Sequence, residues 1–100
     1  MGTFNNFDLC VNEYLEHLRA DYAKYGYTNK SFYAVTGRKY IHIIMEDNQR
    51  SSHSWVVIKP DAKFKFGDIL KSASWKSPAT NFARGNVVEG NFKHIRWVGA

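Results

Sequence analysis

The sequence predicts an α+β fold in which one N-terminal amphipathic helix packs on a four- to five-stranded, mainly antiparallel sheet. Two observations lead to this fold class. Apolar residues recur every three or four positions until about residue 24, whereas from Ser31 onward they alternate with polar residues. The first period is that of a helix with one buried face, and the second is that of a strand. Residues 1–100 are expected to form a single domain, large enough to bury a core without disulfides or metal.

The helix is predicted from about Asn6 to Lys24. Asn5 or Asn6 is expected to cap its N-terminus, and Asp8 is expected in the first turn, where the helix dipole favours a carboxylate. Gly26 follows the last periodic residue and is expected to end the helix in a left-handed conformation. The predicted buried face consists of Phe7, Val11, Tyr14, Leu15, Leu18 and Tyr22.

The rest of the chain contains short segments that are typical of strands. Three of them, separated by short polar connections, predict an antiparallel meander, and Gly37 is expected to have a positive φ in its first turn. Gly67-Asp68 is expected to introduce the fourth strand. The five predicted strands are 32–35, 39–46, 52–59, 69–71 and an edge strand at 94–98.

The position of His42 follows from the alternation in the second strand. Its neighbours Ile41 and Ile43 belong to the core face, so His42 is expected on the opposite face, half-exposed. If the hairpin turns near Gln49, His42 lies opposite Val57 and is not paired with the other strand histidine.

The basic charge is concentrated in the second half of the chain. The formal net charge is +5. Residues 1–50 hold six cations and six acids, whereas residues 51–100 hold eight cations and three acids. This asymmetry favours a polyanionic partner for the second half. The alternative is that the charge serves solubility alone.

The sequence lacks the residue patterns that are typical of several classes of protein. Cys10 is the single cysteine, which excludes an intramolecular disulfide and makes an intracellular location the default. The sequence has no cluster of Cys and His with zinc spacing and no glycine-rich phosphate loop, and no apolar run long enough for a signal or spanning helix. We therefore expect no catalytic residues, no metal, no cofactor and no membrane association.

An irregular, cationic and aromatic segment from Lys71 to Asn86 is the candidate site. It has neither helical nor strand periodicity, and its cations suit phosphate oxygens while Trp75 offers a flat face for a base. Gly85-Asn86 is expected to form a turn that orients the preceding arginine. The predicted ligand-binding residues are Lys71, Ser74, Trp75, Lys76, Arg84 and Asn86.

A structural role for the same residues is the alternative. Trp75 would then cover the open end of the sheet, and Arg84 would form a salt bridge with Asp68 or Glu89.

Four segments of the chain carry a resemblance to known proteins. They are Gly37-Arg38-Lys39-Tyr40, Arg50-Ser51-Ser52-His53, Lys71-Ser72-Ala73-Ser74-Trp75-Lys76-Ser77-Pro78-Ala79 and Ala83-Arg84-Gly85-Asn86. In these segments the sequence resembles small uncharacterised proteins encoded by tailed bacteriophages. The resemblance implies that the protein acts in the cytoplasm of the bacterial host during infection. It implies no mechanism.

Together these features predict a small non-catalytic phage accessory protein that binds a phosphate-bearing ligand. Single-stranded nucleic acid is the first expectation, and a nucleotide, such as a host signalling nucleotide that the protein sequesters, is the second. The alternative is a phage protein that binds and inhibits a host protein through Trp55, Trp75 and Trp97.

Overall fold

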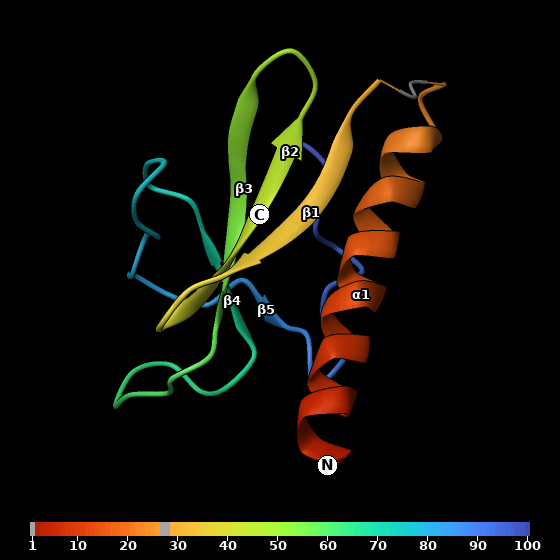
Figure 1. Cartoon of the computed structure of the whole chain (residues 1–100). Helices are drawn as coiled ribbons and strands as arrows, with labels where there is room; N and C mark the ends of the chain where they lie inside the picture. Colours follow the sequence, from red (N-terminus) through yellow and green to blue (C-terminus); the bar gives the residue numbers. More distant parts are fainter. Residues whose placement is uncertain (1, 27–28) are drawn as a thin grey trace.

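The computed structural model describes residues 2–26 and 29–100, and within these ranges it contains one helix and one sheet (Figure 1). The sheet has the strand order β1-β2-β3-β4-β5, and every neighbouring pair is antiparallel. The predicted α+β architecture is therefore confirmed. The elements are α1 (Gly2–Ala23), β1 (Ser31–Thr36), β2 (Tyr40–Glu46), β3 (Arg50–Val57), β4 (Asp68–Lys71) and β5 (Gly85–Asn86).

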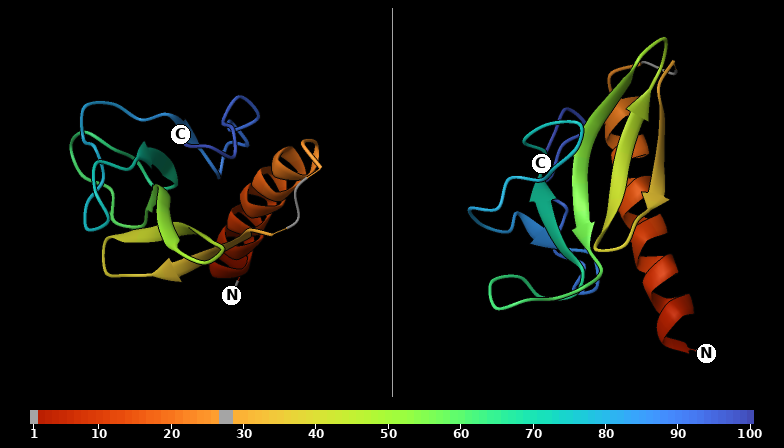
Figure 2. Two further views of the ribbon diagram at one scale, coloured as in Figure 1. Left: turned by 90° about the horizontal axis from the view of Figure 1, so that it is seen from above. Right: turned by 60° about the vertical axis from the view of Figure 1, so that its left-hand side comes forward.

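The sheet separates two layers (Figure 2). Helix α1 and the C-terminal segment 87–100 lie on one side, and the connection 72–84 projects on the other. The larger core fills the helix side, where the predicted buried residues of α1 meet Ile41, Ile43 and Met45 of β2 as expected from their alternation. A smaller cluster of Trp55, Val57, Phe64 and Leu70 lies on the helix-free side.

A β-bulge interrupts the pairing of β2 with β3. Ile43 pairs with Ser54, but Ile44 pairs with Ser52, so His53 is the extra residue. A bulge turns two consecutive side chains to one face of the sheet, and both His53 and Ser54 are buried on the helix side. Ser52 therefore lies on the helix-free face.

These two bulge residues form a buried hydrogen-bonded chain. The Oγ of Ser54 lies 2.8 Å from the hydroxyl of Tyr14 and 2.8 Å from Nδ1 of His53, whose Nε2 lies 2.9 Å from the carbonyl oxygen of Arg96. Because a carbonyl only accepts, Nε2 carries the proton and Nδ1 accepts from Ser54, which in turn accepts from Tyr14. Burial lowers the pKa of His53, which agrees with this neutral form.

Asp21 and His17 of α1 also hold the C-terminal segment. Asp21 accepts hydrogen bonds from the backbone N–H of Trp97 at 2.9 Å and from Nε of Arg96 at 3.1 Å. Nε2 of His17 lies 2.7 Å from the carbonyl oxygen of Ile95. Although burial acts to raise the pKa of Asp21, the bonds from Trp97 and Arg96 outweigh it and lower that pKa.

The predicted N-terminus of the helix was wrong. Helix α1 begins at Gly2, so Asn5 and Asn6 lie inside it and not ahead of it, and Asp8 is beyond its first turn. The sequence signal failed because a capping residue type also occurs within helices. The C-terminus is as expected, since α1 ends at Ala23 and Gly26 has a φ of 78°.

Gly37 does not have the predicted positive φ. Its backbone N–H donates to the carbonyl oxygen of Tyr40 at 2.9 Å, and a Cβ at this position would lie 3.1 Å from the same oxygen. The close approach of the backbone, and not a left-handed conformation, favours glycine here.

Two predictions about the C-terminal third were also wrong. Residues 94–98 do not form an edge strand, and contribute only an isolated bridge between Arg96 and Gly99. The edge is instead Gly85–Asn86, which was expected to be a turn and which pairs with Asp68 and Ile69 as β5. A Cβ on Gly85 would lie 2.2 Å from the carbonyl oxygen of Asn91, so only glycine fits.

Among residues 2–26 and 29–100, no helix is both long and apolar enough to cross a bilayer.

We expect Ser54→Ala to destabilise the protein more than Tyr14→Phe. The first change leaves both the Tyr14 hydroxyl and Nδ1 of His53 buried without a partner, at about 1–3 kcal/mol for each group, whereas the second leaves the Ser54 bond to His53 intact. Urea denaturation of the two variants measures the difference. Equal free energies of unfolding would show that the chain is not a connected unit.

We expect Asp21→Asn to remove a pH-dependent part of the stability. The folded pKa of Asp21 lies below its ordinary value of 3.8. Its stabilisation is therefore complete above that value and is lost as the pH falls through the folded pKa. Thermal melts of wild type and variant from pH 7 down to about pH 2 should converge at the acid end. Asp8→Asn, at an exposed position of α1, is the control, and an equal effect of both changes would contradict the assignment.

Candidate functional site

The predicted site segment leaves the sheet at the end of β4 and folds back on itself. Ser72 forms an antiparallel bridge with Pro78, and the backbone N–H groups of Ala73 and Ser74 both donate to the carbonyl oxygen of Ser77 at 3.1 Å. The Ala79 N–H closes the loop on the carbonyl oxygen of Lys71 at 2.7 Å. The backbone of the loop is therefore fixed, and Trp75 lies at its tip.

Trp75 stands against a pair of stacked rings on the helix-free face. The rings of His42 and Trp55 lie 3.7 Å apart and are nearly parallel, at 5°. The edge-on contact of Trp75 with His42 has a centroid distance of 4.8 Å, and the guanidinium of Arg50 lies 5.5 Å from the Trp75 ring. With 42% of its surface exposed, Trp75 presents an aromatic face next to a cation.

The register of the hairpin brings His42 and Trp55 together. His42 lies opposite Trp55 and not opposite Val57 as predicted, because the hairpin turns at Asn48 and the extra residue His53 shifts the pairing beyond it by one position. His42 is also buried where half-exposure was expected. The prediction that it does not pair with His53 is confirmed.

Hydroxyl groups continue from His42 beneath the loop. Nε2 of His42 lies 2.7 Å from Oγ of Ser52, which lies 2.5 Å from Oγ of Ser72. The indole N–H of Trp55 donates to Ser72 at 3.3 Å. Burial lowers the pKa of His42, so the imidazole is neutral at pH 7.

This arrangement includes a serine and a histidine in hydrogen-bond contact, as nucleophilic catalysis requires. A hydrolase also needs a group that orients the imidazole through its second nitrogen. In the part of the chain that the structure describes, no carboxylate is hydrogen-bonded to Nδ1 of His42, and no group of three or more metal-ligating side chains occurs. The hydrogen bonds of this network connect β2, β3 and the stem of the loop that carries Trp75.

Three of the predicted residues lie with Trp75 on this loop and its stem. Lys71 and Lys76 are exposed, and neither takes part in an ion pair with the residues described. Ser74 has a structural contact, since its Oγ lies 3.1 Å from Oγ of Ser77 and accepts from the N–H of Lys76 at 3.2 Å. Arg50 of β3, which lies outside the predicted segment, joins this group.

Arg84 and Asn86 lie elsewhere, beside a separate pocket of about 610 Å³ lined by residues 60–65. The Asn86 side chain is fully engaged in the fold: it donates to the Phe66 carbonyl and to Asp68, and accepts from the N–H groups of Val88 and Glu89. It therefore holds β5 against β4 and offers no free group to a ligand.

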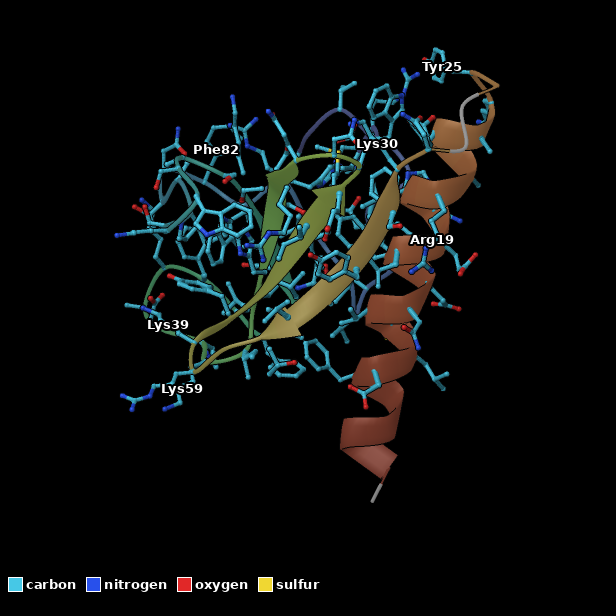
Figure 3. All side chains as sticks on the ribbon, turned by 45° about the horizontal axis from the view of Figure 1, so that its top comes forward. Arg19, Tyr25, Lys30, Lys39, Lys59 and Phe82 are labelled. Carbon is cyan, nitrogen blue, oxygen red and sulfur yellow. The ribbon has the colours of Figure 1, made fainter. Side chains whose placement is uncertain are left out.

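Arg84 stacks on Phe82, with its guanidinium carbon 4.2 Å from the ring centroid. Figure 3 shows Phe82 on the side of the molecule away from Arg19 of α1. The alternative expectation, a salt bridge from Arg84 to Asp68 or Glu89, is not found: Asp68 bonds to Asn86 and to the Lys65 backbone, and Glu89 pairs with Lys65.

The alternative function, binding to a host protein through three tryptophans, requires that these side chains be exposed. Trp55 is buried, and Trp97 is half-buried with its ring 4.8 Å from that of Tyr22. Trp75 alone of the three is exposed.

The sequence signals for Arg50, Ser52 and His42 were weak. Arg50 and Ser52 reach the site only because the bulge at His53 reverses the face on which they lie. A regular alternation would have placed Ser52 on the helix side together with Ser54.

Comparison with known proteins places the chain in a family whose function is unknown. No curated protein and no solved structure is significantly similar to this chain. Residues 6–99 match the family described as "Family of unknown function (DUF7717)". With almost its whole length matched, the chain belongs to that family.

Proposed function

We propose that this protein binds single-stranded nucleic acid, without catalysis, through the surface formed by Arg50, Lys71, Trp75 and Lys76. The observation that carries the proposal is the half-exposed Trp75, fixed edge-on against the His42–Trp55 stack with a guanidinium beside its ring. A base stacks on an aromatic face whatever its identity, and cations beside that face meet the backbone phosphates.

The rigidity of the surface supports this proposal. The loop bonds that close on Ser77 and Lys71, and the hydroxyls of Ser52 and Ser72 beneath it, hold Trp75 in place before any ligand arrives. Binding therefore loses little conformational entropy at this residue. Among the residues that the structure describes, no carboxylate pairs with Lys71 or Lys76, so their charges are available to phosphates.

The resemblance to proteins of tailed bacteriophages supports a setting for this activity, the bacterial cytoplasm during infection. Inhibition of a host protein is the less favoured function, because of its three proposed tryptophan anchors Trp55 is buried and Trp97 is half-buried against Tyr22.

We expect Trp75→Ala to weaken binding of an oligothymidylate of about 15 nucleotides by about 1–3 kcal/mol. The reason is the loss of one stacking partner. Fluorescence anisotropy of the labelled oligonucleotide measures the affinity, and urea denaturation in parallel shows whether the fold persists. A loss of stability without measurable affinity in the wild type would leave Trp75 as a cover for His42 and end the proposal.

We expect Lys76→Ala and Lys71→Ala each to lower the slope of log affinity against log salt by about 0.7, as the loss of one phosphate contact on a single strand does. Lys24→Ala is the matched control, because Lys24 is an exposed lysine at the end of α1, on the other side of the sheet. If Lys24→Ala lowers the slope equally, the attraction is due to net charge and not to this surface.

A further inference from the structure

The connection 72–84, which carries Trp75, contains a second exposed aromatic side chain, that of Phe82. The exposed fraction of Phe82 is 52%, compared with 42% for Trp75. The connection projects from the helix-free side of the sheet, and Figure 3 shows Phe82 on the side of the molecule away from Arg19 of α1. Both rings are therefore presented to solvent on the same side of the sheet.

A guanidinium accompanies each of these two rings. The guanidinium carbon of Arg84 lies 4.2 Å from the ring centroid of Phe82, and that of Arg50 lies 5.5 Å from the ring of Trp75. A planar cation against one face of a ring attracts it and leaves the opposite face for another flat group. The pocket beside Arg84 is lined by three acids and three cations, so we assign Arg84 to holding the ring and not to binding a phosphate.

The segment that carries Phe82 is fixed at both ends. At one end, the backbone N–H of Ala79 donates to the carbonyl oxygen of Lys71 at 2.7 Å. At the other end, the N–H of Arg84 donates to the carbonyl oxygen of Ile69 at 2.7 Å, and the Nε of Arg84 is buried against the protein. Only four residues link these two points, so the ring loses little conformational entropy when a ligand binds.

The length of the chain limits the separation of the two rings. Phe82 follows Trp75 by seven residues, and an extended chain spans at most about 3.6 Å per residue, so the two Cα atoms lie within about 25 Å of each other. Successive nucleotides of a stacked strand are about 3.4 Å apart, so about eight nucleotides cover this distance. A single strand of that length reaches both rings, and its bases stack on either ring whatever their identity.

We propose that Phe82 is a second stacking platform for the same strand, so that the ligand is an oligonucleotide and not a mononucleotide. One base stacks on Trp75, and a base several nucleotides along the strand stacks on the exposed face of Phe82. Because one backbone joins the two bases, the second base binds at a high effective concentration and the two contacts reinforce each other. This inference rests on the proposed function, since it extends the surface at Trp75.

The test compares the oligothymidylate of about 15 nucleotides with thymidine 5′-monophosphate, by fluorescence anisotropy and NMR titration respectively. Phe82→Ala should weaken binding of the oligonucleotide at least about fivefold, and should leave the slope of log affinity against log salt unchanged because no charge is removed. Binding of the mononucleotide should weaken at most about twofold, because its single base occupies one platform at a time. Leu9→Ala, which truncates an exposed apolar side chain of α1 on the other side of the sheet, should change neither affinity.

The outcomes separate this inference from the proposed function. If the wild type does not bind the oligonucleotide, the proposed function fails and this inference fails with it. If the wild type binds and Trp75→Ala weakens binding, but Phe82→Ala has no more effect than Leu9→Ala, only the second platform is overturned. Equal losses for oligonucleotide and mononucleotide in Phe82→Ala would also overturn it, because they indicate a site for one base. Urea denaturation checks the fold, and Phe82→Leu, which keeps the apolar bulk without the flat ring, replaces Phe82→Ala if that variant is unfolded.

Discussion

The hydrogen-bonded chain from Tyr14 through Ser54 and His53 to the Arg96 carbonyl connects the three parts of the fold. It joins the helix, the central strand of the sheet and the C-terminal segment, which forms no regular strand and depends on such contacts for its position. The side chains of Tyr14, His53 and Ser54 are buried, and each depends on the next for its hydrogen bond. The apolar core supplies most of the driving force for folding, but this chain specifies which elements meet.

The bulge at His53 serves both faces of the sheet. On the helix side it turns two consecutive residues into the core, where the hydrogen-bonded chain forms. On the helix-free side it brings Ser52 to His42 and places Arg50 beside the ring of Trp75. The proposed nucleic-acid surface therefore depends on the same local irregularity as the core. The pocket lined by residues 60–65 and by β5 is independent of the bulge, since it includes no residue of β2 or β3.

Much of the fold follows from local patterns, because the helix and the first four strands have clear periods and Gly26 marks the end of α1. The errors arise where a tertiary contact decides. Gly85-Asn86 has the composition of a turn, yet it pairs with Asp68 and Ile69 of β4 and forms a strand. The hairpin register differs from the expected one because the turn is centred on Asn48, where Asp47 accepts from the Gln49 N–H, and because His53 is an extra residue in β3. The candidate segment contained the exposed tryptophan, but composition alone did not separate Arg84 and Asn86 from it.

The extra residue in β3 also bears on how this protein tolerates sequence change. A substitution alters one side chain and leaves its neighbours on their faces, whereas a single-codon deletion near His53 would exchange the inward and outward sides of Arg50, Ser51 and Ser52 together. The guanidinium of Arg50 would then point at the helix, and the ring of Trp75 would lose this neighbouring cation. Homologues can therefore be expected to vary in the composition of β3 more freely than in its length, and insertions to accumulate in the β3–β4 connection instead.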